Sequence, residues 1–253
     1  MPEAGDGLAG QSALVTGGSR GIGAGVAIAL AAAGARVVVS GRDEAALDRV
    51  VATIVAAGGT ALAIPAALTI EDEVVALRVA AEQAHGPVSL LVACAGGGGR
   101  AVPLAQQGME DWRAVLDANL TSLFLTLRSF VPPMMAAARG AVVALSSSAG
   151  RQLSGASLPY AAAKSGVQSL VRQVAAEAAP HGVRINTIAP SAIVTERLAA
   201  APASVREEVA AGFPLRRIGE VGDVTEAALF LLGRRAGWIT GITLDVAGGR
   251  VML

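Results

Sequence analysis

Tyr160 and Lys164 stand four positions apart in the segment Tyr-Ala-Ala-Ala-Lys, and Tyr160 is the only tyrosine of the 253-residue chain. On a helix, this spacing puts both side chains on one face. A free phenol, with a pKa near ~10, exchanges protons poorly at neutral pH. A neighbouring ammonium, together with a positive charge on a bound ligand, favours the phenolate and lowers that pKa. Such pairs are common by chance, but this one predicts a proton donor or acceptor at Tyr160.

Two other polar positions suit the same chemistry. Ser147 lies thirteen residues before Tyr160, just after an apolar run that reads as a strand. In an open α/β sheet, ligands bind at the carboxyl ends of strands, where a hydroxyl can hydrogen-bond a substrate oxygen as charge develops. Ser146 and Ser148 carry the same hydroxyl, so the residues alone do not choose among the three.

Asn119 lies in a predicted helix although asparagine is a mediocre helix former. Its presence among apolar residues suggests a functional role, and the alternative is an ordinary surface asparagine.

A glycine-rich loop follows the first predicted strand and opens the first predicted helix. Residues 16–23 read Thr-Gly-Gly-Ser-Arg-Gly-Ile-Gly. Glycines allow a tight turn and a close approach of the backbone to a pyrophosphate, and the helix N-terminus supplies unpaired N–H groups and a partial positive charge. The loop therefore predicts a dinucleotide-binding site at Gly17, Ser19, Arg20, Gly21, Ile22 and Gly23.

The end of the second predicted strand bears on which dinucleotide binds. NAD-specific folds usually have an acidic residue there, bonded to the hydroxyls of the adenosine ribose. This chain has Gly41 at that place, followed by Arg42. Arg42 and Arg20 can offer forked donors to a 2′-phosphate, which a carboxylate would repel. The sequence therefore predicts NADP(H) as the cofactor. The alternative is that both arginines are solvated surface charges.

Short apolar runs alternate along the chain with longer segments of helical period. The runs are continuous, as expected for parallel strands covered on both faces. We predict strands at 12–16, 35–40, 60–64, 88–93, 141–146, 183–189 and 243–246. We predict helices at 21–33, 43–57, 71–85, 110–137, 159–180 and 223–234. This order indicates an α/β fold, a Rossmann-like doubly wound parallel sheet of about seven strands with helices on both faces.

No repeat or linker divides the chain, so we expect one dinucleotide-binding domain over 1–253. The stretch 191–215 is less regular and contains two prolines. It predicts a small flap over the substrate, with an ordinary surface excursion as the alternative.

Composition excludes several classes of function. With 20 basic and 20 acidic residues the formal net charge is zero, so no strong field attracts nucleic acid or an anionic membrane. Cys94 is the only cysteine, which fits a reducing compartment. The only histidines are His85 and His181, and since these three residues are far apart in the sequence, no metal site is expected. The uncharged stretch 50–70 is long enough for a membrane span, but two glycines and a proline interrupt it. Because no secretory signal follows Met1, we expect a cytoplasmic protein.

The loop at 16–23 has the pattern T-G-x-x-x-G-x-G, and with Asn119, Ser147, Tyr160 and Lys164 it resembles the short-chain dehydrogenase/reductase family in order and spacing. The resemblance extends over the whole chain. It implies a catalytic set in which Tyr160 exchanges the proton, Ser147 binds the substrate oxygen, and Asn119 holds a water next to Lys164. It also implies further cofactor contacts, at Ala95, Gly96, Tyr160, Lys164, Pro190, Ile193 and Thr195.

The chain departs from the family's pattern at four places. Ala-Cys-Ala-Gly at 93–96 replaces Asn-Asn-Ala-Gly, which removes amides that brace the neighbouring backbone. Ala-Ala-Leu at 66–68 lacks the acid that lies near the adenine, so one hydrogen bond to the cofactor is lost. Pro-Ser at 190–191 replaces Pro-Gly, and Ala-Gly-Gly at 247–249 replaces acid-Gly-Gly. None touches the expected proton path, so activity is still expected.

The resemblance implies NADPH-dependent reduction of a ketone to a secondary alcohol, with Tyr160 as the proton donor. The similarity is to 3-oxoacyl-carrier-protein reductases, so we expect a 3-oxoacyl thioester or a related carbonyl substrate, and acyl carrier protein as a candidate partner. Arg128, Arg139 and Arg172 are candidates for docking it, but Pro180-His181 stands where those reductases tend to have a basic residue. Enoyl reductases of the same superfamily usually have a longer gap between the tyrosine and the lysine, so the three-residue gap in this chain counts against that activity.

Two other functions remain open. One is an NAD-dependent alcohol dehydrogenase of the same family, which an acid at position 41 would favour. The other is a non-catalytic NADP-binding regulatory protein, which loss of the tyrosine or the lysine would favour. Members of the family are mostly tetramers, and the Ala- and Val-rich helices expected at 110–137 and 159–180 imply a homotetramer. The alternative is that these helices only pack on the sheet.

Overall fold

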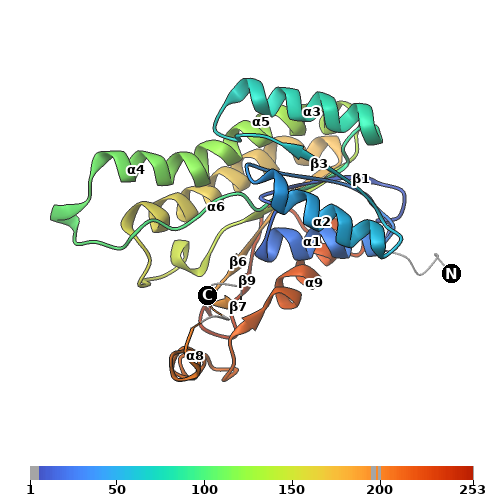
Figure 1. Cartoon of the computed structure of the whole chain (residues 1–253). Helices are drawn as coiled ribbons and strands as arrows, with labels where there is room; N and C mark the ends of the chain where they lie inside the picture. Colours follow the sequence, from blue (N-terminus) through green and yellow to red (C-terminus); the bar gives the residue numbers. More distant parts are fainter. Residues whose placement is uncertain (1–5, 195–197, 199–200, 253) are drawn as a thin grey trace.

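The computed structural model describes residues 6–194, 198 and 201–252. Its core is a parallel sheet of seven strands in the order β3-β2-β1-β4-β5-β6-β9, which confirms the predicted doubly wound α/β fold (Figure 1). The strands are β1 (Ser12–Thr16), β2 (Arg36–Gly41), β3 (Thr60–Pro65), β4 (Leu90–Ala93), β5 (Gly140–Leu145), β6 (Val183–Pro190) and β9 (Thr243–Val246). The strand order reverses between β1 and β4, and such sheets bind ligands outside the strand ends at that point.

Helices cover both faces of the sheet. One face carries α1 (Gly21–Ala32), α2 (Glu44–Ala56) and α9 (Val221–Leu232), and the other carries α3 (Glu71–His85), α5 (Ser122–Ala136) and α6 (Leu158–Ala178). Short 3-10 turns lie at Leu104–Gln106, Ser148–Gly150, Ala179–His181 and Arg234–Ala236.

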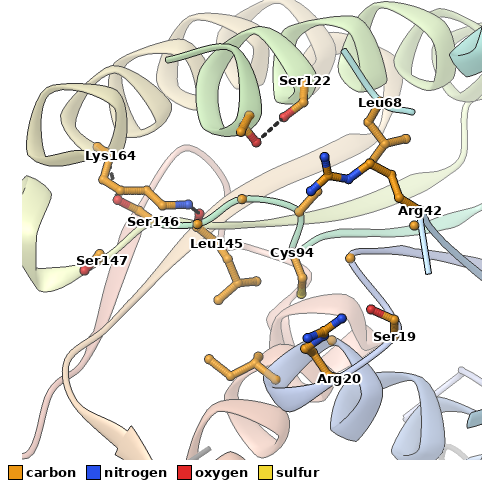
Figure 2. A pocket seen from close by; sticks show the side chains of 18 of the residues that line it. Ser19, Arg20, Arg42, Leu68, Cys94, Ser122, Leu145, Ser146, Ser147 and Lys164 are labelled. Carbon is orange, nitrogen blue, oxygen red and sulfur yellow. Dashed lines mark hydrogen bonds between the residues drawn. The ribbon is translucent and has the colours of Figure 1, made fainter. Parts of the chain in front are cut away.

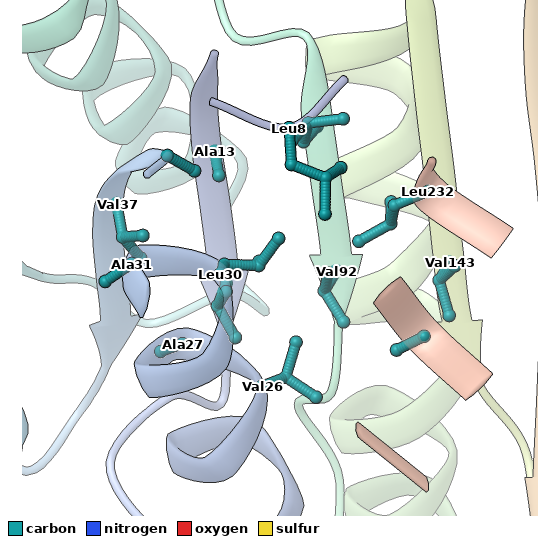
Figure 3. Packing of buried hydrophobic residues seen from close by; sticks show 14 of the residues in the cluster. Leu8, Ala13, Val26, Ala27, Leu30, Ala31, Val37, Val92, Val143 and Leu232 are labelled. Carbon is teal, nitrogen blue, oxygen red and sulfur yellow. The ribbon is translucent and has the colours of Figure 1, made fainter. Parts of the chain in front are cut away.

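Burial on both sides of the sheet explains the continuous apolar runs. All residues of β1 and of β4 are buried. Figure 3 shows one face, where Val26 and Leu30 of α1 pack toward the strands near Val92. Close packing of this kind holds the strand ends, and the turns that follow them, in fixed positions.

The helix predicted over 110–137 is interrupted by a bulge. It consists of α4 (Met109–Leu116), a π-helical segment η2 (Asp117–Thr121) and α5. Asn119 Nδ2 donates to Val115 O at 2.8 Å, which is the carbonyl that the Asn119 backbone would bond in an α-helix. The Ser122 N–H instead bonds Asp117 O, five residues back. Hydrophobic periodicity does not reveal such a bulge, because one polar side chain causes it.

Two apolar stretches are packed in the fold. Residues 50–70 form the end of α2, a turn, β3 and the turn after it, so the rejection of a membrane span there agrees with the structure. Among the described residues, the helical run Met109–Ala136 is long and apolar enough to cross a membrane. However, Leu127, Phe130 and Met134 of this run belong to the buried cluster on the α3–α5–α6 face. A core helix has the same composition.

The segment predicted as a flap, 191–215, is described only in part, and Thr195 lies outside the described residues. It contains β7 (Ile193–Val194), which pairs with β8 (Gly219–Glu220) in a separate small sheet, and α8 (Ala203–Ala211). Figure 1 shows α8 apart from the helices that cover the sheet. The two short strands were not predicted, because two residues carry no hydrophobic period. A flap role for this segment stays a prediction.

Candidate active site

A cavity of about 710 Å³ lies at the carboxyl edge of the sheet (Figure 2). Its walls come from the turns after β1, β2, β3, β4, β5 and β6, from η2 and the start of α5, and from the start of α6. It brings together most of the residues selected from the sequence: Gly17, Ser19, Arg20, Ile22, Gly23, Arg42, Ala95, Gly96, Ser147, Tyr160, Lys164, Pro190 and Ile193. Gly21 and Asn119 are not among the lining residues.

The glycine loop lets the turns after β1 and β4 touch. Gly17 has φ +66°, and a Cβ there would lie 2.7 Å from Ala95 N. Arg20 is the N-cap of α1, in an extended conformation, and α1 has neither a side-chain cap nor an acidic residue in its first turn. The first N–H groups of α1 are therefore available to an anion in the cavity, with the helix dipole behind them.

Arg20 and Arg42 lie at the end of the cavity away from Ser147 and Lys164 (Figure 2). Arg20 Nη2 pairs with Asp43 Oδ2 at 2.9 Å. The other oxygen, Asp43 Oδ1, caps α2 by accepting from the Ala46 N–H at 3.1 Å. Both arginine side chains are exposed, so each guanidinium can bind a further anion.

Position 41 has room for a side chain. A Cβ on Gly41 would meet its nearest neighbours, in Ser19 and Leu47, at 3.9 Å, and the backbone there is not in the left-handed region. Packing therefore does not explain the missing acid at this position.

The first turns of α6 bring Tyr160 and Lys164 into the cavity. Ser157 Oγ caps the helix by accepting from the Tyr160 N–H at 3.4 Å, and Pro159 fits the first turn because no donor is needed there. Lys164 is only 4% exposed. Its Nζ donates to Leu145 O at 2.7 Å and lies 5.6 Å from the centre of the Tyr160 ring. The two side chains therefore share a face, as their spacing predicts.

Burial dominates the pKa values of this pair. It lowers the pKa of Lys164 to about 8, and the interaction with Cys94 opposes that change. It raises the pKa of Tyr160, and a hydrogen bond with Ser147 opposes the rise. Without a bound cofactor the pKa of Tyr160 is therefore raised, because desolvation outweighs the hydrogen bond with Ser147. Tyr160 is thus a protonated phenol at neutral pH, which is the form that can donate. The lowering expected from Lys164 together with a positively charged ligand stays a prediction.

Three neighbouring serines after β5 differ in their partners. Ser146 is buried and donates to Lys164 O at 2.8 Å. Ser148 is also buried, and donates to a hydroxyl in the turn after β6 at 3.2 Å. Ser147 lines the cavity, as Ser146 does. Its Oγ accepts from Ala149 N at 3.2 Å, and its interaction with Tyr160 opposes the rise in the pKa of that phenol. The residue types alone did not separate the three hydroxyls, and the family resemblance selected Ser147. The structure places Ser147 in the cavity with Tyr160.

Asn119 lies behind the cavity wall. Its Nδ2 donates to Gly97 O at 2.8 Å, and its Oδ1 accepts from Gly97 N at 3.2 Å. A Cβ on Gly96 would overlap Asn119 Oδ1 and would lie 3.4 Å from Lys164 Nζ. Asn119 therefore braces the loop after β4, where this chain lacks the two amides of the family pattern. That Asn119 holds a water next to Lys164 stays a prediction.

The cavity also includes residues that the sequence argument did not select. These are Asp43, Ala66, Leu68, Thr69, Cys94, Gly97, Ala118, Ser122, Leu145 and Ser191. Most follow directly after strands, and that position was the available signal. Burial raises the pKa of the Cys94 thiol to about 12, so this group stays neutral. Among the described residues, no group of three or more His, Cys, Asp or Glu side chains could hold a metal ion.

Comparison with known proteins agrees with this arrangement. The family model described as enoyl-(acyl carrier protein) reductase matches residues 17–250. A 3-oxoacyl-[acyl-carrier-protein] reductase of Synechocystis sp. is 39% identical over 250 residues, covering 97% of this chain and 98% of the relative. A 7alpha-hydroxysteroid dehydrogenase of Escherichia coli K12 is 36% identical over 245 residues, covering 96% and 95%.

Solved structures give the same result. A 3-oxoacyl (acyl-carrier-protein) reductase of Agrobacterium tumefaciens C58 with NADP bound matches with a TM-score of 0.91 and 33% identity, covering 98% of this chain and 97% of that one. A 3-oxoacyl-[acyl-carrier protein] reductase of Brucella melitensis with bound NAD matches with a TM-score of 0.89 and 32% identity, covering 98% and 94%. The chain belongs to the short-chain dehydrogenase/reductase family, enzymes that use a nicotinamide cofactor to interconvert alcohols and carbonyl compounds.

Proposed function

We propose that this enzyme reduces a ketone to a secondary alcohol with NADPH, and that Asn119, Ser147, Tyr160 and Lys164 form its catalytic set. The observation that carries the proposal is the arrangement of one cavity. The protonated Tyr160 phenol and the Ser147 hydroxyl lie at one end, and two exposed arginines lie at the other. A glycine loop and an uncapped helix N-terminus follow β1, and the loop touches the turn after β4.

The residues present fit a dinucleotide phosphate. The pyrophosphate would be held by the loop at Gly17 and the first N–H groups of α1, where a Cβ at Gly17 would collide with the next turn. A 2′-phosphate would be held by Ser19, Arg20 and Arg42. The nicotinamide end would contact Ala95, Gly96, Tyr160, Lys164, Pro190 and Ile193.

When NADPH is held by these residues, the hydride for the carbonyl carbon would come from its nicotinamide. The Tyr160 phenol, kept protonated by burial, donates its proton to the carbonyl oxygen. The Ser147 hydroxyl hydrogen-bonds the same oxygen as negative charge develops. The Lys164 ammonium stabilises the phenolate that remains on Tyr160. Asn119 keeps the Gly97 backbone in place beside these groups.

Replacing Gly41 with aspartate tests the cofactor assignment. A Cβ at this position meets only ordinary van der Waals contacts, and the aspartate carboxylate would repel a 2′-phosphate and attract ribose hydroxyls. We expect the ratio of kcat/KM for NADPH over NADH to fall by about 10- to 100-fold, the worth of one to two charge-assisted hydrogen bonds. Steady-state kinetics with both cofactors measure this ratio.

Arg42→Ala should shift the ratio in the same direction. Arg49→Ala is the matched control, since Arg49 is an exposed arginine of α2 that does not line the cavity. If the ratio is unchanged in both Gly41→Asp and Arg42→Ala, the NADP assignment is wrong.

Ser147→Ala tests the choice among the serines. We expect kcat to fall by about 100-fold, because one hydrogen bond to the developing oxyanion is lost. Ser148→Ala is the control, since its hydroxyl bonds the turn after β6, and it should change kcat by less than about 3-fold. Equal losses in the two variants would contradict the role given to Ser147.

A 3-oxoacyl thioester or a related ketone is the substrate that we propose, supported by the relative from Synechocystis sp.. Acyl carrier protein has less support as a partner, because Arg128 is already paired with Glu71 at 2.9 Å. Alcohol oxidation with NAD is the second candidate, favoured by the hydroxysteroid dehydrogenase relative and by the Brucella melitensis structure with NAD. Tyr160 would then act as the base, in the reverse of the steps above.

We also propose that the chain folds as one domain, and that four copies assemble as a homotetramer through α4, α5 and α6. Large apolar side chains are exposed on these helices, namely Met109, Phe124 and Leu158. Burial against a second copy would remove them from water.

A further inference from the structure

The turn that carries Ser147 rests directly on the helix that carries Tyr160 and Lys164. A Cβ on Gly150 would lie 2.6 Å from the Lys164 carbonyl carbon and 2.7 Å from Ser165 N, so only glycine allows this approach. Ser165 Oγ donates to Gly150 O at 3.0 Å. Ser146 Oγ donates to Lys164 O at 2.8 Å. Figure 2 shows Ser146 near the backbone of Lys164, with Ser147 apart from it.

Gln168 holds this turn at both ends. The side chain lies one helical turn beyond Lys164 and is 5% exposed. Its Nε2 donates to Ser146 Oγ at 2.9 Å, immediately before Ser147. Its Oε1 accepts from Arg151 Nη1 at 3.5 Å, at the far end of the same turn. One buried amide thus joins the two flanks of Ser147 to α6.

Arg151 connects this turn to the edge strand of the sheet. Its Nη2 and Nε donate to the two carboxylate oxygens of Asp245, on β9, at 2.9 and 3.2 Å. The two side chains are only 20% and 18% exposed. A forked pair of this kind fixes direction as well as distance, which a single contact does not. The turn after β5 is therefore tied to α6 on one side and to β9 on the other.

We propose that Gln168 and the Arg151–Asp245 pair are positioning residues, which hold Ser147 at hydrogen-bonding distance from Tyr160 and from the substrate oxygen. None of the three residues lines the cavity, so they act through Ser147 and touch no reacting atom. The inference rests on the proposed function, because it requires that Ser147 contribute to turnover.

Gln168→Leu is the principal test, since leucine fills similar space without the amide. We expect kcat to fall by about 10-fold, because small displacements of a reacting group carry large rate penalties. The dissociation constant for NADPH should stay within about 2-fold of the wild-type value, because Gln168 lies outside the cofactor cavity. Gln173→Leu, the same change at an exposed position of α6, is the matched control and should leave kcat unchanged.

A double-mutant cycle with Ser147→Ala separates positioning from general damage. If Gln168 acts through Ser147, its replacement should cost less than about 2-fold in kcat once the serine hydroxyl is gone. Asp245→Asn removes the charge and keeps the size, and its effect on kcat should likewise shrink when Ser147 is already alanine. This variant replaces Gln168→Leu in the test if the leucine variant fails to fold. Equal losses with and without Ser147 would overturn the positioning role. A Ser147→Ala enzyme with full turnover would instead overturn the proposed function, and the inference with it.

Discussion

Tyr160→Phe should lower turnover by about 1,000-fold while NADPH still binds, because general acid catalysis is typically worth about 10²–10⁴-fold. The substitution removes one oxygen, the proposed proton donor, and leaves the ring, so the packing of α6 against the cavity should not change. Stopped-flow or steady-state consumption of NADPH measures turnover, and quenching of protein fluorescence measures cofactor binding.

The burial of Tyr160 makes this prediction specific. Because the pKa of Tyr160 is raised, the phenol is protonated across the neutral range and is ready to donate. A Tyr160→Phe enzyme that retained more than about a tenth of wild-type kcat would show that the proton comes from another group or from water. Loss of NADPH binding together with turnover would mean that the cavity had collapsed, and the mechanism would then be judged from the Ser147 variant.

Lys164→Met should have the second-largest effect, and it should act in opposite directions on activity and stability. Turnover should fall by about 100-fold or more, because the ammonium no longer stabilises the phenolate left on Tyr160. The folded protein should become more stable at pH 7, by about 2 kcal/mol, because a charged ammonium is no longer buried. Urea unfolding of the two proteins measures the difference.

The pH dependence of that difference follows from the direction of the shift. The pKa of Lys164 is about 8 in the folded protein, against an ordinary lysine value of 10.5, so only the unfolded chain holds the proton between these values. The free energy of unfolding of the wild-type protein therefore rises with pH between about 8 and 10.5, as folded Lys164 loses its proton. The advantage of Lys164→Met should shrink as the pH rises from about 8 toward 10. If Lys164→Met were less stable than wild type at pH 7, and the difference in the free energy of unfolding did not change with pH, the assigned pKa would be contradicted.

The sheet could be predicted from the sequence because each strand is a continuous apolar run buried on both faces. The ends of β1, β4 and β9 lie where the pattern predicts them, within two residues. The pairing of Tyr160 with Lys164 could also be predicted, since helical spacing alone brings them together. The π segment at Asn119 could not, because it depends on one side chain that takes a backbone carbonyl.

The sign of the Tyr160 pKa shift could not be predicted from the sequence either. Spacing shows that an ammonium is near, but it does not show how far water is excluded or that Lys164 Nζ is directed to Leu145 O. Likewise, the residue types alone do not distinguish Ser147 from Ser146, which the family resemblance did. The partners that occupy the Ser146 hydroxyl, Gln168 and the Lys164 carbonyl, meet only in the folded chain. These features depend on desolvation and on distant contacts, which no local pattern encodes.

The central claim is tested most directly by following the nicotinamide absorbance of the wild-type enzyme with NADPH or NADH and a panel of ketones that includes 3-oxoacyl thioesters. We expect rapid oxidation of NADPH, slow oxidation of NADH, and turnover of at least one ketone that the Tyr160→Phe variant does not support. Tight binding of NADPH without turnover of any ketone, or a clear preference for NADH, would contradict it.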